Sequence, residues 1–308
     1  MKKIIVIVGP TASGKTDLSL KIAKLFNGEC INADSTQIFK GTDIATNKIK
    51  TEEMQGVVHH LISIKEVNET YSVADYQTQA RTIIDKILKQ DKTPIVIGGT
   101  GLYINALIMN YNFLFENQTI VGFKEQFEEL SNHQLWEQLN QIDTLAANEI
   151  HVNNRNKIIR ALEIIEYSKS LKSDLNKNNK TLFYDNLIII GIKPDREKLH
   201  QRINERVLQL TDRGLFDEIK KAYEDNNFNA SAQALKCIGG PEIIQYLKQE
   251  IDYDQTIALM QRNNRRYARR QMTWFRNQYD NVHWFEHQYS DFEQMCDQVL
   301  EFLKTKIK

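Results

Sequence analysis

Short apolar runs alternate along the chain with longer stretches in which apolar residues recur at helical spacing. The runs occupy residues 4–8, 30–33, 93–97 and 187–192. Short, largely apolar runs of this kind are typical of strands buried on both faces of a parallel sheet. The stretches between them have the three- and four-residue spacing of amphipathic helices. This order predicts an α/β fold, a P-loop NTPase-like core with a parallel sheet flanked by helices.

The pattern changes between the third and the fourth run. From about residue 112 to 182 the chain is rich in Glu, Gln, Asn and Lys, and apolar residues such as Leu135 and Leu139 lie at helical spacing. We therefore expect a core domain made of residues 1–111 and 183–308, with C-terminal helices. Residues 112–182 are expected to form an inserted, all-helical subdomain.

The composition is that of a globular protein, with 41% hydrophobic residues and with 40 basic side chains balanced by 40 acidic ones. Any nucleic-acid site must therefore be a local patch. The three cysteines, Cys30, Cys237 and Cys296, lack metal-binding spacing and indicate reduced thiols. No apolar stretch is long enough for a signal sequence or a membrane span. We expect a cytoplasmic protein without membrane contact and, since no motif suggests assembly, a monomer.

The first apolar run leads directly into a phosphate-binding motif. Residues Gly9-Pro10-Thr11-Ala12-Ser13-Gly14-Lys15-Thr16 match the pattern G-x-x-x-x-G-K-[ST] between a predicted strand and a predicted helix. In that order, loop N–H groups and a helix N-terminus surround an anionic phosphate. Lys15 is expected to reach the outer phosphates, and the Thr16 hydroxyl to bind Mg²⁺. The alternative, a chance match on a structural turn, is disfavoured by this context.

Two polar stretches follow later strands at their carboxyl ends, where open parallel sheets bind ligands. Asp34-Ser35-Thr36-Gln37 offers a carboxylate that could act as a base or contact a metal, or could instead cap the next turn. Gly98-Gly99-Thr100 stands where a P-loop ATPase or GTPase usually carries a Walker-B acid. Because that acid and a guanine-binding motif are both missing, we infer that the P-loop holds a diphosphate that leaves, not a γ-phosphate that is transferred.

Basic residues gather in two places. Six arginines lie between residues 261 and 278 without any acid, interleaved with Tyr267, Trp274 and Phe275. On a helix the five arginines between residues 262 and 270 would lie largely on one side, where they could neutralise phosphates or pair with acidic neighbours. A smaller cluster of Arg155, Lys157 and Arg160 could contact nucleic acid or form a solvated helix face.

In their order along the chain, these motifs resemble those of the tRNA dimethylallyltransferase family, also called tRNA isopentenyltransferases. The resemblance covers nearly the whole chain. It is carried by residues 9–16, 34–37, 59–61, 98–103, 160–163 and 266–271. It implies transfer of a dimethylallyl group from dimethylallyl diphosphate to N6 of adenosine 37, next to the anticodon of tRNA. It also implies Mg²⁺ as cofactor and an inserted helical domain that binds the anticodon stem-loop.

The resemblance also implies a role for individual residues. Asp34 would be the base that takes the N6 proton, Thr100 would lie near the leaving oxygen, and Lys15 would stabilise the diphosphate bound by residues 9–16. The tRNA contacts implied or expected are Asp34, Ser35, Thr36, Gln37, Asn156, Lys157, Ile158, Ile159, Arg160, Arg265 and Arg269. The chain departs from the family at Gly240-Pro241, where a Tyr-Lys pair is usual.

Two other hypotheses stay open on the sequence. A nucleoside or nucleotide kinase shares the P-loop and the acid after the second strand, although the Gly98-Gly99-Thr100 stretch argues against phosphoryl transfer from ATP. A non-catalytic RNA-binding module would keep the P-loop only as a structural turn. In that protein, replacement of Asp34 would change no measurable activity.

Overall fold

The computed structural model describes residues 2–111, 113, 120–175 and 181–307. The chain divides into two compact units, each with its own dense internal contacts. The first, called here the sheet unit, comprises Met1–Tyr71, Tyr76–Ile104 and Asp185–Lys308. The second, called the helical unit, comprises Ser72–Asp75 and Asn105–Tyr184.

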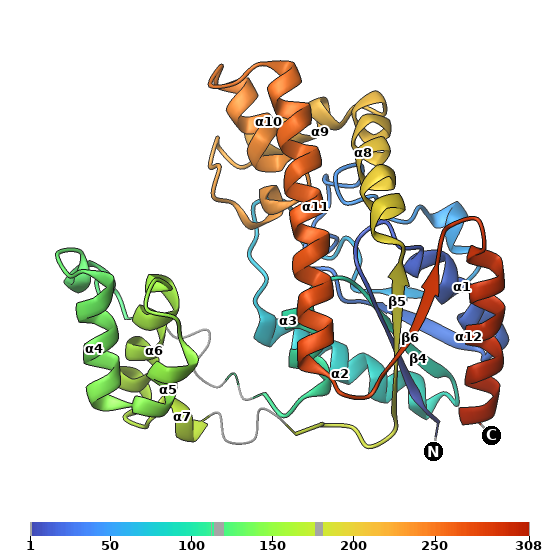
Figure 1. Cartoon of the computed structure of the whole chain (residues 1–308), viewed down its shortest axis with the longest axis horizontal. Helices are drawn as coiled ribbons and strands as arrows, with labels where there is room; N and C mark the ends of the chain where they lie inside the picture. Colours follow the sequence, from blue (N-terminus) through green and yellow to red (C-terminus); the bar gives the residue numbers. More distant parts are fainter. Residues whose placement is uncertain (1, 112, 114–119, 176–180, 308) are drawn as a thin grey trace. The chain divides into compact units, whose positions relative to one another are not determined.

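The sheet unit is built on six strands, and all neighbouring strands run parallel (Figure 1). They are β1 (Ile4–Val8), β2 (Gly28–Asn32), β3 (His59–His60), β4 (Thr93–Ile97), β5 (Leu187–Pro194) and β6 (Val282–His287). Their order in the sheet is β3-β2-β4-β1-β5-β6. Strands β1 and β4 are buried along their whole length, as their apolar runs predict. The predicted α/β fold with a parallel sheet is confirmed.

The edge strand β6 is not evident from the sequence pattern. It reads Val-His-Trp-Phe-Glu-His, and only its last residue is buried because a single neighbour, β5, pairs with it. The Trp284 ring lies beside Gly191 of β5, where an added Cβ would stand 2.4 Å from the ring. This contact depends on the pairing of β5 with β6, so the sequence of β6 alone could not predict it.

Helices cover the sheet and extend from its strands. They are α1 (Lys15–Leu25), α2 (Val73–Lys89), α3 (Gly101–Ile108), α8 (Arg196–Asp212), α9 (Leu215–Asp225), α10 (Gly240–Leu247), α11 (Tyr253–Gln278) and α12 (Phe292–Lys306). Leu18 of α1 and Val299 of α12 pack in the same core as Ile7 of β1. Asp195 caps α8 as predicted, because its Oδ1 accepts hydrogen bonds from the backbone N of residues 197 and 198, both at 3.0 Å. No helix in the described part of the chain has both the length and the apolar composition needed to cross a bilayer.

The helical unit has a core of its own. Its helices are α4 (Asn132–Ile142), α5 (Thr144–Glu149), α6 (Arg155–Ser168) and α7 (Lys172–Leu175). Leu135 and Leu139 of α4 pack against Ile158 and Leu162 of α6. Ser131 caps α4 in a capping box with Gln134. The limits 112–182 that the sequence suggests for a separate domain stay a prediction.

Candidate functional site

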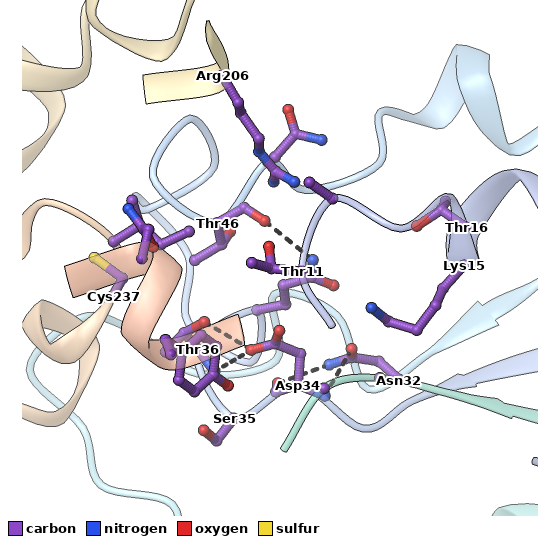
Figure 2. Close-up of a pocket in the computed structure, with 18 of the residues that line it drawn as sticks. Thr11, Lys15, Thr16, Asn32, Asp34, Ser35, Thr36, Thr46, Arg206 and Cys237 are labelled. Atoms are coloured by element: carbon purple, nitrogen blue, oxygen red, sulfur yellow. Dashed lines mark hydrogen bonds between the residues drawn. The ribbon is translucent and has the colours of Figure 1, made fainter. Parts of the chain in front are cut away.

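The segments that follow β1, β2, β4 and β5 line one large pocket in the sheet unit. Because all four strands are parallel, their carboxyl ends meet at the same edge. The pocket has a volume of about 1420 Å³, larger than the roughly 300–1,000 Å³ of a typical small-molecule site. Figure 2 shows Lys15, Asp34 and Arg206 pointing into it from three different elements. A pocket of this size has room for two reactants.

The P-loop turns between β1 and α1 as the motif predicts. Ala12 and Gly14 both take left-handed backbone angles, with φ of 60° and 86°, and such angles favour glycine. Glycine is needed at position 14 for a second reason, since a Cβ there would lie 2.3 Å from the Phe292 ring. The loop thus places the N-terminus of α1 at the pocket.

The Lys15 side chain folds back over the P-loop. Its Nζ donates a hydrogen bond to the Pro10 carbonyl at 2.6 Å. Burial lowers the pKa of Lys15 to about 8; the Asp34 carboxylate opposes this shift and the Arg206 guanidinium adds to it. Lys15 is therefore still mostly a cation at neutral pH, and it faces the space where the motif places phosphate.

Two side chains from distant parts of the sequence brace the P-loop. Gln271 of α11 accepts a hydrogen bond from Thr11 N at 2.8 Å and donates one to Gly99 O at 2.9 Å. The Tyr289 hydroxyl donates to Ala12 O at 3.0 Å. An added Cβ at position 99 would lie 2.2 Å from Gln271 Nε2, so glycine is required for this approach. Sequence reasoning assigned no role to Gln271 or Tyr289, because nothing in the linear pattern brings them to the loop.

Asp34 is both part of a turn and directed into the pocket. Its Oδ1 accepts hydrogen bonds from Thr36 N at 3.0 Å and from Thr36 Oγ1 at 2.7 Å. Its main chain is held by the buried Asn32 amide, which accepts from Asp34 N at 3.0 Å and donates to Asp34 O at 3.1 Å. Figure 2 shows the carboxyl group facing the pocket interior. The local turn thus orients a carboxylate toward the pocket, and Asn32 is a supporting residue that sequence reasoning missed.

Thr100 connects the segments that follow β2 and β4. Its Oγ1 accepts from Ser35 N at 3.0 Å and donates to Ser35 Oγ at 3.2 Å. Tyr267 of α11 forms hydrogen bonds with Thr100 and Gln271, and burial, together with the Asp34 charge, raises the pKa of its phenol. Tyr267 is therefore neutral at physiological pH. Its hydrogen bonds link Thr100 to Gln271 in a network near Asp34.

Gln37 follows the same turn, and its amide is already engaged. Its Nε2 donates to Thr46 O at 3.1 Å. The buried Lys48 stabilises this loop by donating to Phe39 O at 2.6 Å and to Ser63 Oγ at 2.9 Å. Residues 34–37 line the pocket together with Thr46, which belongs to the loop that Lys48 stabilises.

The candidate tRNA-contacting segment lies in the helical unit, at the start of α6. Asn156 and Lys157 are exposed there, whereas Ile158 and Ile159 are buried in the core of the unit. Arg160 pairs with Glu163 at 2.6 Å. The two isoleucines can therefore orient this segment but cannot present their side chains at its surface.

The arginines of α11 divide between two surroundings. Arg262, Arg266, Arg269 and Arg270 are exposed, as a phosphate-binding helix face requires. Arg265 is half-buried and donates a hydrogen bond to Asn204 Oδ1 of α8. Arg269 is thus free to contact a ligand at the surface, while Arg265 also fastens α11 to α8.

Gly240-Pro241, the departure from the family pattern, opens α10 at the pocket. Gly239, with φ of 79°, caps the helix, and Pro241 lies in its first turn. An added Cβ on Gly240 would lie 2.0 Å from the Leu235 carbonyl oxygen. A tyrosine side chain therefore has no space at position 240 on this backbone.

The pocket thus combines a phosphate loop, a cation and a carboxylate. Among the residues that the structure describes, no group of three His, Cys, Asp or Glu side chains could hold a metal ion without help. The sequence model for IPP transferase matches residues 37–278.

The chain belongs to the IPP transferase family.

Proteins similar to it along their whole length include a tRNA dimethylallyltransferase from Anoxybacillus flavithermus, 42% identical over 99% of this chain and 97% of the relative. One from Enterococcus faecalis is 41% identical over 99% of both chains. Among solved structures, a tRNA isopentenylpyrophosphate transferase from Bacillus halodurans has a TM-score of 0.74 at 39% identity, covering 99% of this chain and 97% of that one. A eukaryotic dimethylallyltransferase acting on tRNA has a TM-score of 0.86 at 27% identity, covering all of this chain and 81% of that one. Membership of the IPP transferase family confirms the resemblance drawn from the motifs.

Proposed function

We propose that this IPP transferase family member transfers a dimethylallyl group from dimethylallyl diphosphate to N6 of adenosine 37 in tRNA. The relatives that match its whole length are named tRNA dimethylallyltransferases. The observation that carries the proposal is the pocket itself, where a P-loop with its lysine faces a carboxylate. A kinase would need a γ-phosphate site and a second acid, whereas the position after β4 holds Gly98-Gly99-Thr100.

In the proposed reaction, one bond forms and one breaks at C1 of the dimethylallyl group. The N6 lone pair forms the new C–N bond, the C1–O bond breaks, and its electron pair leaves with the diphosphate. The N6 proton passes to Asp34, whose carboxylate faces the pocket and is held by Thr36. An exocyclic amine conjugated to a purine is a weak nucleophile, so a positioned base assists the step. The products are N6-dimethylallyl adenosine and diphosphate.

The leaving diphosphate requires positive charge and hydrogen-bond donors. We assign this role to Lys15, to backbone N–H groups of the P-loop and to the N-terminus of α1. Thr100 forms hydrogen bonds with Ser35 and Tyr267, which line the same pocket, and so orders the residues around Asp34. Preorganised donors of this kind stabilise charge that develops in the transition state.

The residues present fit a magnesium ion bound together with the substrate. Mg²⁺ typically takes one or two protein ligands, and phosphate oxygens and water complete its shell. Thr16, exposed in the first turn of α1 at the pocket, would supply the protein ligand. When bound, the ion would neutralise charge on the diphosphate.

The target adenosine must leave the base stack to reach a pocket of this kind. Residues 34–37 line the pocket and are assigned to contact the extruded base. We further propose that residues 112–182 form a separate domain that binds the anticodon stem-loop. Asn156, Lys157 and Arg160 would contact that RNA from this domain, and Arg265 and Arg269 from α11 of the sheet unit.

Single-turnover transfer tests this function. Labelled dimethylallyl diphosphate, Mg²⁺ and an anticodon stem-loop with adenosine at the target position are mixed with wild-type protein or with Asp34→Asn. Asparagine can still accept the Thr36 hydrogen bonds, so the turn is kept while the base is removed. We expect transfer by the wild type and a loss of about a hundredfold or more in the variant.

The other outcomes separate the hypotheses. Transfer that survives Asp34→Asn keeps the reaction but removes Asp34 as its base. No transfer by folded wild-type protein, together with phosphoryl transfer from ATP to a nucleoside or nucleotide, would establish the kinase instead. Stem-loop binding without any transfer would leave the non-catalytic RNA-binding module.

A further inference from the structure

The carboxylate of Glu218 holds the backbone of a loop from a distant part of the sequence. Glu218 belongs to the first turn of α9 and is half-buried. Its Oε2 accepts a hydrogen bond from Ile44 N and its Oε1 accepts one from Ala45 N, both at 2.8 Å. Each carboxylate oxygen thus binds one N–H group, and hydrogen bonds to an ionised acceptor are the stronger kind. This contact joins α9 to residues 42–48, called here the 42–48 loop.

The 42–48 loop is a compact turn that is held at both ends. Thr46 Oγ1 donates to Thr42 O at 2.7 Å, and Thr46 N donates to the same oxygen at 3.2 Å. The buried Lys48 holds the end of the loop through its bonds to the neighbouring chain. Glu218 holds the start of the loop, because it binds two successive N–H groups there. The position of Thr46, between these two anchors, therefore depends on Glu218.

Thr46 in turn orients the side-chain amide of Gln37. Gln37 Nε2 donates to Thr46 O at 3.1 Å, and both residues line the pocket. A carbonyl oxygen only accepts hydrogen bonds, so the NH₂ group of Gln37 must be the part of the amide that faces it. In the described part of the chain no residue donates to the amide oxygen of Gln37. Gln37 therefore keeps one acceptor and a second N–H donor for a ligand.

An amide fixed in this orientation favours a base with an exocyclic amine. Adenine presents the N6 amine as a donor beside the N7 acceptor, and a glutamine amide can pair with both. One N6 hydrogen remains for the Gln37 oxygen when the other passes to Asp34. A base with an oxygen in place of the amine would set two acceptors against each other. An amide released from Thr46 could turn its NH₂ group toward that oxygen, so the orientation decides the preference.

We propose that Glu218 sets the base selectivity of the pocket by fixing the 42–48 loop and, through Thr46, the orientation of Gln37. This inference rests on the proposed function. Glu218 is a positioning residue: it binds loop backbone and acts on the target base only through the Gln37 amide. Without its carboxylate, the start of the loop loses its anchor and Thr46 O no longer holds the amide in one orientation.

The test measures how strongly the protein prefers adenosine at the target position. Two anticodon stem-loops, identical except for adenosine or inosine at that position, compete for wild-type protein, Glu218→Ala, Gln37→Ala and the double variant. Glu218→Gln, which keeps one acceptor, is a milder second variant. Glu224→Ala is the control, since Glu224 is an exposed residue of α9 that does not line the pocket. Binding of inorganic diphosphate with Mg²⁺ and thermal melting are measured for every variant.

We expect the wild type to bind the adenosine stem-loop about tenfold more tightly than the inosine one, as amide pairing with adenine does. Glu218→Ala and Gln37→Ala should each reduce this preference to about twofold or less, and Glu218→Gln should reduce it in part. The double variant should lose no more than Gln37→Ala alone, because both residues act through one amide. Diphosphate affinity should stay within about twofold throughout, and Glu224→Ala should keep the wild-type preference.

Three results would overturn the inference. A full preference for adenosine in folded Glu218→Ala and Glu218→Gln would reduce Glu218 to a structural contact of α9. Losses that add in the double variant would mean that Glu218 does not act through Gln37. A fall in diphosphate affinity as large as the loss of preference would indicate a general disturbance of the pocket. Failure of the proposed function is visible separately, as absent transfer by the wild type, because the preference is measured by binding alone.

Discussion

Thr36 holds the carboxylate of Asp34 through a single oxygen. The Thr36 backbone N and Oγ1 both donate to Asp34 Oδ1, at 3.0 and 2.7 Å. Within the described residues, Oδ2 of Asp34 has no hydrogen-bond partner. The turn therefore fixes the orientation of the carboxylate and leaves one oxygen for a ligand.

Thr36→Val removes one of these two hydrogen bonds and preserves the shape of the side chain. We expect the single-turnover transfer rate to fall about tenfold or more, since hydrogen bonds to charged groups contribute roughly 1.5–3 kcal/mol. Stem-loop affinity should stay within about twofold. Thr82→Val on α2, where the exposed hydroxyl donates to Thr78 O, is the matched control. An unchanged rate in Thr36→Val would mean that the hydroxyl bond does not orient the base.

The pH dependence of diphosphate binding should report Lys15. Because its pKa is lowered to about 8, Lys15 is charged below that pH and loses its proton above it in the free protein. Bound diphosphate favours the cation, so affinity should be level below pH 7.5 and fall by up to about tenfold per pH unit above 8. Titration calorimetry in buffers of different ionisation enthalpy should detect proton uptake on binding at pH 9. Lys15→Gln should bind weakly, without this slope, and a wild-type affinity that is constant to pH 9.5 would contradict the assignment.

Gln271 joins the P-loop to the segment that follows β4, and both of its hydrogen bonds should matter. Gln271→Ala leaves Thr11 N and Gly99 O without their partner, so we expect the free energy of unfolding to fall by about 1–3 kcal/mol. Diphosphate affinity should fall as well, because Thr11 belongs to the P-loop. Chemical denaturation and diphosphate titration measure the two effects. Gln201→Ala, on the exposed face of α8, should change neither.

Gly240 should tolerate no side chain. The Cβ of alanine would stand 2.0 Å from the Leu235 carbonyl oxygen, which belongs to the backbone and cannot rotate away. We expect Gly240→Ala to lower the free energy of unfolding by about 2 kcal/mol or more, as overpacking commonly does. Pro241→Ala, at the exposed neighbouring position, should cost less than about 1 kcal/mol. If Gly240→Ala melted like the wild type, the tight packing of α10 on residue 235 would be wrong.

The basic residues at the start of α6 should separate into a structural and a binding residue. Arg155 donates to Leu130 O at 2.6 Å and also to Phe127 O, so Arg155→Ala should destabilise the helical unit by about 1–3 kcal/mol. Lys157 is exposed, and Lys157→Ala should leave stability unchanged. It should lower stem-loop affinity and reduce the slope of log affinity against log salt by roughly one. If Arg155→Ala and Lys157→Ala both weakened RNA binding equally and neither changed stability, the assignment of Arg155 as a structural residue would be wrong.

The sequence alone was sufficient to predict the features that depend on neighbouring residues. The β-branched run at 4–8 and the glycines of the P-loop predict a buried strand, a tight turn and a phosphate-binding helix N-terminus, because each depends only on neighbouring residues. The carboxyl-end rule for parallel sheets placed Asp34 and Thr100 near that loop, and both lie there. The family followed from the order of these motifs.

The tertiary structure alone decided which distant side chains support the site. Gln271 lies 260 residues from Thr11, and Tyr289 lies 277 residues from Ala12, yet both hydrogen-bond the P-loop. In the structure Ile158 is buried and Arg155 donates to a backbone carbonyl, although the sequence alone offers both residues within a segment that could contact RNA. The position of Arg206 at the pocket could not be predicted either, because the sequence does not distinguish it from the other arginines of an amphipathic helix. Hydrogen-bond partners and burial depend on how the elements pack, and that information is spread over the whole chain rather than held in any one stretch of it.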